Sequence, residues 1–344
     1  MLKVCVVFGG MNSEHEISLR SAASVLENLD KTKYEVSTIG ITKSGKWLGY
    51  TGPAAMIADG TWAAGDSPGR YTAGDPAIHC ERAEPRPFDV VFPVLHGKNG
   101  EDGTVQGFLE LAGIPYVGCG VLSSAMCMDK EISHIILKNA GIPKTKLFAV
   151  HQDEMDSFDE KAALYETELC YPMFVKPANA GSSVGISKVQ DRIALRKALA
   201  LAFGHDKKAV VEQAMTGREI ECAVLGNRSP EAAKVLAEIE PANDFYDYAG
   251  KYLDSSTKLH LPARISEESA AKVRELAVKA FKVMGCRGMA RVDFFVPKDG
   301  NPILNEINTI PGFTSISMYP RLFIESGMSY PELLDRLIAL AMED

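Results

Sequence analysis

Continuous apolar runs alternate with helical patterns in the first third of the chain. Residues 3–10, KVCVVFGG, form an apolar run that ends in glycines, which is typical of a buried parallel strand. A helical pattern follows over residues 13–29, and Ser13 with Glu16 three positions later predicts a capping box at its start. Further strands are predicted at residues 34–42, 89–97 and 114–118. This alternation predicts an α/β, Rossmann-like domain over residues 1–125.

The remaining two thirds of the chain mix strand and helix patterns less regularly. Helices are predicted at residues 123–141, 266–285 and 329–342, and the last of them is expected to cover the final domain. Strand pairs are predicted within residues 171–189 and 208–226. Residues 43–87 show little periodicity and are interpreted as an elaborated loop region. We expect a central domain over 126–212 and a C-terminal domain over 213–344.

A hairpin is predicted at residues 291–308, RVDFFVPKDGNPILNEIN. Two runs rich in β-branched and aromatic residues flank Asp299-Gly300, a strong turn signal. A turn centred there gives two facing pairs on one side of the hairpin, Asp293 with Glu306 and Arg291 with Asn308. The other side is expected to be buried and carries Val292, Phe294, Ile303 and Ile307.

The polar side of this hairpin has the chemistry of a metal site. Directly opposed Cβ atoms lie about 4.5–5.5 Å apart, so Asp293 and Glu306 would repel each other without a cation between them. Two carboxylates and the amide oxygen of Asn308 are hard ligands that suit Mg²⁺. Arg291 beside them could hold an anionic group. The alternative is a solvated hairpin face with a surface pair.

A glycine-rich loop follows the predicted strand that ends near Lys176. Gly181 and Gly185 would let backbone N–H groups approach an anion closely, and Ser182 and Ser183 add hydroxyl donors. The loop is not a Walker A motif, because no GK[ST] opens a helix. The lysine before it favours phosphate binding over an ordinary turn.

Other polar residues stand where predicted strands end. Glu212 and Glu219 flank a linker and could accept hydrogen bonds from ribose hydroxyls and an exocyclic amine, or be ordinary solvated glutamates. Glu14 could face an ammonium group, or complement a helix dipole. His96 lies at the mouth of the HGKNGEDG turn. Residues 241–262 hold four aromatics without periodicity and suit an active-site loop.

Composition narrows the class of protein. The chain has 344 residues, 46% hydrophobic and 24% charged, and a net charge of −8, which argues against a nucleic-acid partner. Its seven cysteines include no CxxC pair, so we expect reduced thiols in a cytoplasmic protein. No apolar run approaches the roughly 18 residues that span a membrane, so no membrane partner is expected.

Taken together and in order, the motifs resemble the ATP-grasp enzymes and, within them, the D-alanine–D-alanine ligases. The motifs that carry the resemblance are FGGMNSEHEIS, LHGKNGEDG, MDK, VKPANAGSSVG, VEQ, FYDYAGKY, ARVDFF and NEINTIPGFTSIS. The resemblance covers nearly the whole chain. It implies a Rossmann-like N-terminal domain followed by a two-lobed α+β ATP-grasp fold. It also implies a reaction that joins two D-alanines through a D-alanyl phosphate, with ATP and two Mg²⁺ ions, for which Mn²⁺ can substitute.

The resemblance assigns roles to residues spread over the chain. The implied metal ligands are Asp293, Glu306 and Asn308. The implied nucleotide contacts are Lys130, Lys176, Ser183, Glu212, Glu219 and Lys251. The implied catalytic groups are Glu14, Ser182, Tyr252, Arg291 and Ser317. The implied substrate contacts are Glu14, His96, Arg291, Gly312, Ser317 and Met318. In this scheme Glu14, Ser182 and Tyr252 form one hydrogen-bonded set.

The resemblance also bears on the second substrate and on assembly. The FYDYAGKY form around Tyr252 differs from relatives that make D-alanyl-D-lactate. Met318 stands where relatives that make D-alanyl-D-serine tend to carry arginine, which favours D-alanine here. Two other classes stay open: a nucleotide-binding regulatory protein without turnover, and an ATP-grasp ligase for another carboxylate and amine. The family suggests a homodimer in bacterial cytoplasm, with small molecules as the other partners.

Overall fold

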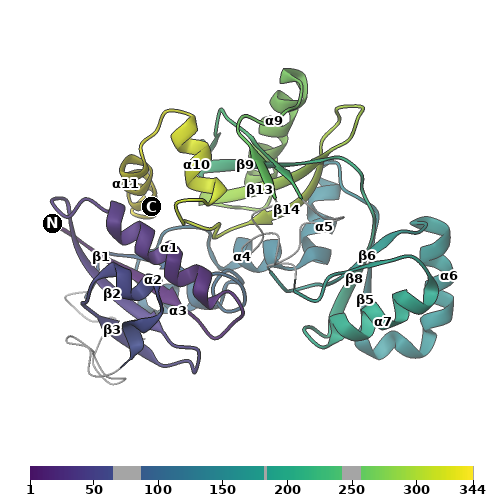
Figure 1. Cartoon of the computed structure of the whole chain (residues 1–344), viewed down its shortest axis with the longest axis horizontal. Helices are drawn as coiled ribbons and strands as arrows, with labels where there is room; N and C mark the ends of the chain where they lie inside the picture. Colours follow the sequence, from purple (N-terminus) through teal and green to yellow (C-terminus); the bar gives the residue numbers. More distant parts are fainter. Residues whose placement is uncertain (65–86, 182–183, 242–256, 344) are drawn as a thin grey trace.

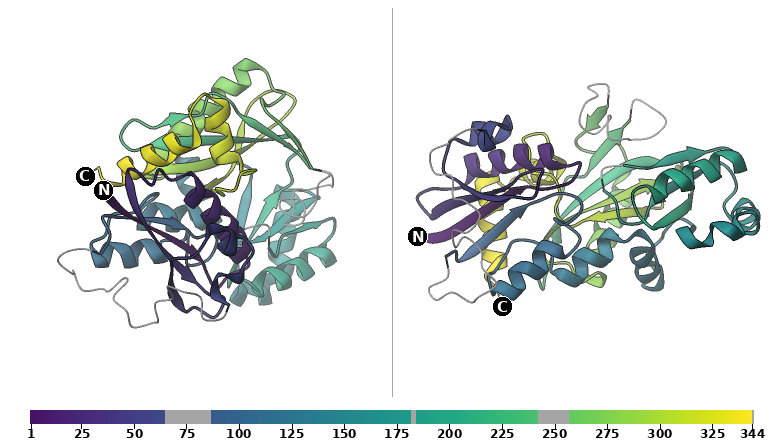
Figure 2. Two further views of the ribbon diagram at one scale, coloured as in Figure 1. Left: turned by 60° about the vertical axis from the view of Figure 1, so that its left-hand side comes forward. Right: turned by 90° about the horizontal axis from the view of Figure 1, so that it is seen from below.

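The computed structural model describes residues 1–64, 87–181, 184–241 and 257–343, which form three β-sheets and their covering helices (Figure 1). The strands of the three sheets lie within residues 2–94, 147–213 and 218–308. The division into domains 1–125, 126–212 and 213–344 stays a prediction. The sheet of the central segment lies at one end of an elongated molecule, far from the N-terminal sheet (Figure 2).

The first sheet has the order β3-β2-β1-β4. Its strands are β1 (Leu2–Gly9), β2 (Tyr34–Ile41), β3 (Trp47–Tyr50) and β4 (Val90–Val94). The strands β2 and β4 run parallel to β1 on its two sides, as the apolar runs predict, and β3 is antiparallel to β2. Its helical elements are α1 (His15–Asn28), α2 (Ala54–Ala58), η1 (Thr61–Ala63) and α3 (Thr104–Ala112). The strand predicted at 114–118 is reduced to a single parallel bridge between Val91 and Tyr116.

The start of α1 differs from the predicted capping box. The cap position is Glu14, whose side chain makes no cap hydrogen bond within the described part of the chain. The side chain of Asn12 instead accepts a hydrogen bond from the Glu14 N–H at 2.9 Å. Glu16 points to Lys43 and forms an ion pair with it. The capping-box prediction is therefore wrong, because the loop before the helix takes over the role of the cap.

The helix predicted at 123–141 is two helices, α4 (Val121–Met128) and α5 (Lys130–Asn139). Asp129 between them has an extended backbone, with φ −79° and ψ 107°. Its carboxylate accepts hydrogen bonds from the N–H groups of Glu131 and Ile132, both at 3.1 Å. An aspartate in this position caps the second helix and ends the continuity of the first. The break places Lys130 at the start of α5.

The second sheet has the order β5-β8-β6-β7, and all its strand pairs are antiparallel. Its strands are β5 (Leu147–His151), β6 (Met173–Pro177), β7 (Ser187–Val189) and β8 (Lys208–Gln213). Its helical elements are η2 (Gln152–Ser157), α6 (Phe158–Glu168) and α7 (Arg192–Phe203). Side chains from α6, α7 and the strands form a separate apolar core here. The strand pair predicted around the glycine-rich loop is thus β6 and β7.

The third sheet has the order β12-β11-β9-β13-β14, with β10 paired to β9. Its strands are β9 (Arg218–Gly226), β10 (Glu231–Ala232), β11 (Ala237–Glu240), β12 (Lys258–His260), β13 (Gly288–Val296) and β14 (Ile303–Asn308). The helices of this part are α9 (Glu267–Val283), α10 (Met318–Glu325) and α11 (Tyr330–Ala341). The predicted hairpin is β13 and β14, and α9 packs on β9 and β13.

The last helix does more than cover the C-terminal part. Leucines of α11 share one apolar core with side chains of α1, β1 and β9. At its exposed side, Asp335 accepts hydrogen bonds from Lys33 Nζ and Tyr34 Oη, both at 2.7 Å. The helix therefore joins the first sheet to the third, as Figure 1 shows for α11 beside α1 and α10. The helix packs on the C-terminal part as expected, and it also contacts the first sheet and α1.

Candidate active site

The hairpin of β13 and β14 presents the predicted polar face. Both predicted pairs are present: Arg291 with Asn308, and Asp293 with Glu306. The apolar face is buried at Val292, Phe294 and Ile307. Towards the turn the pairing shifts by one residue, so Phe294 faces Leu304. Leu304 is therefore buried and Ile303 is only half-buried, which makes the prediction for Ile303 wrong.

Arg291 is held by carboxylates on two strands. Its Nε and Nη2 donate to the two oxygens of Asp293 at 2.8 and 2.7 Å. Its Nε also lies 3.4 Å from Oε2 of Glu221, which comes from the neighbouring strand β9. Asn308 Nδ2 donates to Asp293 Oδ2 at 3.0 Å. This bidentate arrangement fixes the guanidinium plane over the hairpin face, where it can meet an anion.

The donor set on this face fits a hard divalent cation. The carboxylates of Asp293 and Glu306 face each other, and the side chain of Asn308 reaches the same carboxylate of Asp293. Across the described residues, no three His, Cys, Asp or Glu side chains gather in a metal-binding arrangement. Two carboxylates with one amide oxygen leave room for phosphate oxygens and water, which is how Mg²⁺ is commonly bound.

The predicted nucleotide residues converge on this face from the second sheet. Lys176 Nζ lies 2.6 Å from Glu212 Oε2, and both side chains are 14% exposed. Burial alone would lower the pKa of Lys176, but the carboxylates of Glu212, Glu306 and Glu219 raise it above its ordinary value. The structure thus brings Glu212, Glu219 and Glu306, from two predicted sites, around the ammonium group of Lys176. Lys130 Nζ donates to the carbonyl of Ala180 at 2.7 Å, at the start of the glycine-rich loop.

Glu14 is buried between two glycines from distant loops. A Cβ placed on Gly97 would lie 2.3 Å from Oε2 of Glu14, and one placed on Gly181 would lie 2.8 Å from it. Both positions therefore require glycine while the carboxylate is there. Asn12 supports this arrangement by donating to the carbonyls of His96 and Lys98 at 2.7 and 2.8 Å. Glu14 is thus placed where the first sheet meets the glycine-rich loop.

His96 is buried and connects the first sheet to the loop after β14. Its Nδ1 lies 3.0 Å from the carbonyl oxygen of Ile310, and its Nε2 lies 3.2 Å from Ser21 Oγ. The same Oγ accepts a hydrogen bond from the Phe313 N–H at 3.2 Å. Burial lowers the pKa of His96 below its ordinary value, although the nearby Glu14 opposes this. Burial therefore favours the uncharged imidazole, whose two ring nitrogens connect the loop after β14 to α1.

Sequence reasoning missed Glu101, which follows His96 in the HGKNGEDG turn. Its Oε1 lies 3.5 Å from the Cβ position of Gly181, on the same side as the carboxylate of Glu14. Burial, followed by the charge of Glu14, raises the pKa of Glu101 to about 8. A carboxyl group that is neutral near pH 7 can donate a hydrogen bond. The signal was available, because Glu101 stands in a glycine-rich turn at a strand end.

The loop before α10 carries the predicted site for the second substrate. Ser317 is the cap residue of α10, and its Oγ accepts a hydrogen bond from the Thr314 N–H at 3.0 Å. A Cβ on Gly312 would lie 2.7 Å from this Oγ, so the two predicted residues are neighbours. The side chain of Met318 is buried in the apolar core shared with α11. Its role in selectivity stays a prediction.

Four predicted residues lie outside the described ranges: Ser182, Ser183, Lys251 and Tyr252. The hydrogen-bonded set expected from Glu14, Ser182 and Tyr252 therefore stays a prediction. The residue before Ser182 is Gly181, which is described and approaches Glu14.

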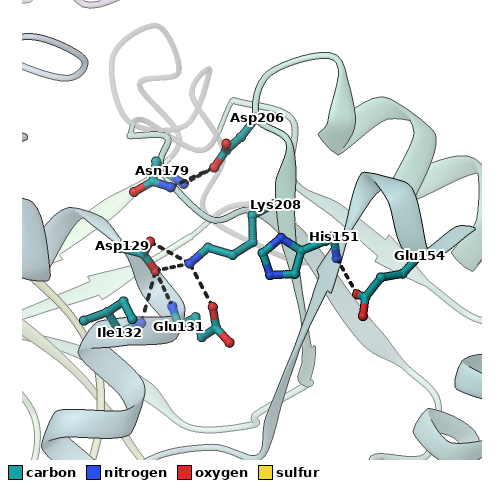
Figure 3. A network of polar contacts seen from close by, with 8 residues as sticks. All are labelled: Asp129, Glu131, Ile132, His151, Glu154, Asn179, Asp206 and Lys208. Carbon is teal, nitrogen blue, oxygen red and sulfur yellow. Dashed lines mark hydrogen bonds and ion pairs between the residues drawn. The ribbon is translucent and has the colours of Figure 1, made fainter.

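Sequence reasoning also missed a network of charged residues on both sides of Lys130 in the chain, formed by Asp129, Glu131 and Lys208 (Figure 3). Lys208 Nζ donates to Asp129 Oδ1 and Oδ2 at 2.9 and 2.7 Å and to Glu131 Oε2 at 2.8 Å. Lys208 opens β8 in the second sheet, whereas Asp129 and Glu131 belong to the α4–α5 junction. The Lys130 N–H also donates to the carbonyl of Ala178 at 3.1 Å. These contacts join the lysine to the strand end that carries the glycine-rich loop.

The fold and this set of charged residues define an ATP-grasp ligase, an enzyme that activates a carboxylate with ATP and couples it to an amine. Two family models match, described as D-ala D-ala ligase N-terminus over residues 3–119 and D-ala D-ala ligase C-terminus over residues 136–339. The chain belongs to the D-alanine–D-alanine ligase family, whose members use ATP and a divalent metal. None of the helices in the described ranges is long and apolar enough to cross a membrane.

Named relatives match along the whole chain. It is 50% identical to a D-alanine–D-alanine ligase of Acetivibrio thermocellus, over 99% of this chain and 96% of that protein. It is 52% identical to a D-alanine–D-alanine ligase of Caldicellulosiruptor bescii, over 99% of this chain and 95% of that protein. Among solved structures it is similar to the VanG D-Ala:D-Ser ligase from Enterococcus faecalis, with a TM-score of 0.89 and 42% identity over 99% of both chains. The structure of the Coxiella burnetii D-alanine–D-alanine ligase is similar with a TM-score of 0.81 and 35% identity, over 99% of this chain and 95% of that chain.

Proposed function

We propose that this protein joins two D-alanines into D-alanyl-D-alanine for peptidoglycan synthesis, with ATP and Mg²⁺. The observation that carries the proposal is the single face on which the hairpin presents Arg291, Asp293, Glu306 and Asn308. Family membership supports the substrate, because several named relatives carry that activity in their names. A homodimer and a cytoplasmic location, expected from the family resemblance, belong to the same proposal.

Activation of the first D-alanine requires a carboxylate oxygen to attack the γ-phosphate of ATP. Phosphoryl transfer depends mainly on positioning and on positive charge near the transferring group. Lys130 and Lys176 supply that charge from the second sheet, and Glu212 and Glu219 would hold the adenine and ribose. Mg²⁺ on Asp293, Glu306 and Asn308, or Mn²⁺ in its place, would add charge neutralisation at the phosphates. The products are D-alanyl phosphate and ADP.

The second step forms the peptide bond. The amine of the second D-alanine attacks the activated carbonyl, and phosphate leaves. Arg291 and the Gly312 N–H would stabilise the negative charge on the tetrahedral oxygen. Glu14 would bind the ammonium of the first D-alanine, near His96. Ser317 would bind the carboxylate of the second.

A second candidate function is the formation of D-alanyl-D-serine. It is supported by the similarity to the VanG D-Ala:D-Ser ligase, which spans 99% of both chains. Met318 stands beside Ser317 and offers a thioether, which cannot hydrogen-bond a substrate hydroxyl as arginine can. A single pocket difference shifts discrimination by only ~1–3 kcal/mol, so the choice of amine has to be measured.

The test is phosphate release from ATP and Mg²⁺ with D-alanine alone, then with D-serine or D-lactate added, and products identified by mass spectrometry. We expect D-alanyl-D-alanine as the main product. Glu306→Gln should abolish release, whereas Lys146→Met, at an exposed lysine paired with Glu168, should not change it. A product that contains D-serine or D-lactate would show that the second substrate is not D-alanine. No phosphate release that depends on a D-amino acid would refute the proposed function.

A further inference from the structure

The strand β14 contains an irregularity next to the metal-binding face. Leu304 and Ile307 are both buried, with exposed fractions of 0% and 5%, although they are three residues apart. In a regular strand, residues three apart point to opposite faces. Their partners on β13, Phe294 and Val292, are only two residues apart. Asn305 is the extra residue, so β14 has a β-bulge there.

This bulge decides which side chain faces Asp293. From the turn side, the register pairs Phe295 with Ile303 and Phe294 with Leu304. If that register continued, Asp293 would face Asn305. A slip of one residue sends every following side chain to the other face of the strand. The inserted Asn305 therefore brings Glu306 onto the face of Asp293.

The outer edge of the bulge is held by the connection between α5 and β5. In the strand order of the described sheet, β14 is the last strand, so its outer edge is not covered by another strand of that sheet. The carbonyl of Pro143 accepts a hydrogen bond from the Leu304 N–H at 2.9 Å. Lys144 forms a parallel bridge with Leu304, and its Nζ donates to the carbonyl of Asn305 at 2.5 Å. Lys144 thus bonds to the inserted residue itself.

A lysine is unusual at this position, because its side chain is half-buried. Burial lowers the pKa of Lys144 to about 8, and the carboxylate of Glu212 opposes that change. The other charged groups around it are Lys176, Glu306 and Lys130. A neutral residue could fill the space without this desolvation cost. The contact that the ammonium gains in return is the Asn305 carbonyl.

We propose that Lys144 is a positioning residue for Glu306. By holding the carbonyl of the bulge residue Asn305, it fixes the register that places the Glu306 carboxylate opposite Asp293. This inference rests on the proposed function, in which Glu306 is a metal ligand. Groups that orient metal ligands typically change metal affinity 10–100-fold when they are removed.

The test compares Lys144→Met, which loses the donor, with Lys144→Arg, which keeps a donor and the charge. Lys146→Met is the matched control, because it makes the same change at an exposed lysine two residues away. The probe is Mn²⁺ in the presence of ATP, with free Mn²⁺ measured by electron paramagnetic resonance, and KM for ATP is measured separately. We expect Lys144→Met to weaken Mn²⁺ binding roughly 10-fold, with little change in KM for ATP. Lys144→Arg should restore most of the affinity, and Lys146→Met should match the parent.

Glu306→Gln shows whether Lys144 acts through Glu306. In that background Lys144→Met should weaken Mn²⁺ binding no further, because the carboxylate to be positioned is gone. The inference would be overturned if Lys144→Met left the Mn²⁺ affinity unchanged, whether or not the KM for ATP changed. Unchanged affinity in Glu306→Gln itself would refute the metal assignment of the proposed function. Melting curves check that each variant is folded, and Lys144→Gln, too short to reach Asn305, replaces Lys144→Met if that variant is not.

Discussion

Replacing Asp129 should separate two contributions that one carboxylate makes to the nucleotide site. It caps α5 through the N–H groups of Glu131 and Ile132, and it binds Lys208 with both oxygens (Figure 3). Asp129→Asn keeps a capping side chain but loses the charge, whereas Asp129→Ala loses both. The next residue is Lys130, so each change also acts on a predicted phosphate contact.

The expected magnitudes follow from these contacts. An N-cap aspartate is worth about 1 kcal/mol over alanine, and asparagine caps equally well. A hydrogen bond to a charged group contributes about 1.5–3 kcal/mol. The Asp129 and Lys208 side chains are only 16% and 14% exposed, so solvent screens them little. Lys208 keeps Glu131 at 2.8 Å, so we count one lost charged interaction. We therefore expect losses of about 2 kcal/mol for Asn and about 3 kcal/mol for Ala.

Thermal unfolding and ATP kinetics test this together. For a chain of this length 1 kcal/mol corresponds to about 2 °C in melting temperature, so we expect decreases of about 4 and 6 °C. KM for ATP should rise about tenfold in both variants, which corresponds to one phosphate contact of about 1.4 kcal/mol. Glu268→Gln is the matched control, because it neutralises an exposed acid paired with Lys272 and should change neither quantity.

Two results would refute this reasoning. Equal melting temperatures for the Asn and Ala variants would show that the cap contributes nothing to stability. Lower melting temperatures with an unchanged KM for ATP would show that the contacts of Asp129 with α5 and Lys208 stabilise the fold without positioning Lys130.

Three further changes give independent predictions. The stability of Glu101→Gln should depend less on alkaline pH than that of the parent. In the parent, the pKa of Glu101 is raised from 4.5 to about 8 on folding, so ionisation of this carboxyl destabilises the folded state increasingly as pH rises between those values. Urea unfolding at pH 5 and 9 measures the difference. Glu238 has the opposite sign, because hydrogen bonds from Arg264 overcome burial and lower its pKa to about 2, so its stabilisation is present above pH 4.5 and is lost as pH falls towards 2. Glu238→Gln lacks this stabilisation already at neutral pH, so its stability should depend less on pH between 4.5 and 2 than that of the parent. Acid unfolding measures this, and an unchanged pH profile would contradict the role given to Glu238. Gly97→Ala should raise KM for D-alanine, because the added Cβ would lie 2.3 Å from Oε2 of Glu14 and would displace the carboxylate, and because a φ of +69° is unfavourable for alanine. A steady-state assay with unchanged KM would contradict the placement of Glu14.

Much of the fold was predictable because it depends on local patterns. Continuous apolar runs that end in glycine predicted the parallel strands β1 and β4, whose residues are buried on both faces. The turn at Asp299-Gly300 predicted the pairs of Asp293 with Glu306 and Arg291 with Asn308. These features follow from neighbours a few residues away, so the sequence alone contains them.

The errors occurred where distant segments replaced a local interaction. Ser13 and Glu16 have the spacing of a capping box, but Asn12 supplies the hydrogen bond and Glu16 pairs with Lys43. The break at Asp129 was missed although aspartate is a preferred cap residue, and the contact of its carboxylate with Lys208, 79 residues later, is not visible in the local pattern.

The class of protein and most of the residues proposed for its chemistry can be identified from the amino-acid sequence, because residue types and their spacing are local properties. How those residues are placed relative to one another is visible only in the folded protein. The tertiary structure gave the bulge at Asn305 that brings Glu306 opposite Asp293, and the contact from Lys144 that holds it. It also gave the burial that raises the pKa of Glu101. The physical reason is that register shifts, desolvation and contacts between sheets depend on residues far apart in the chain, which periodicity along the sequence does not record.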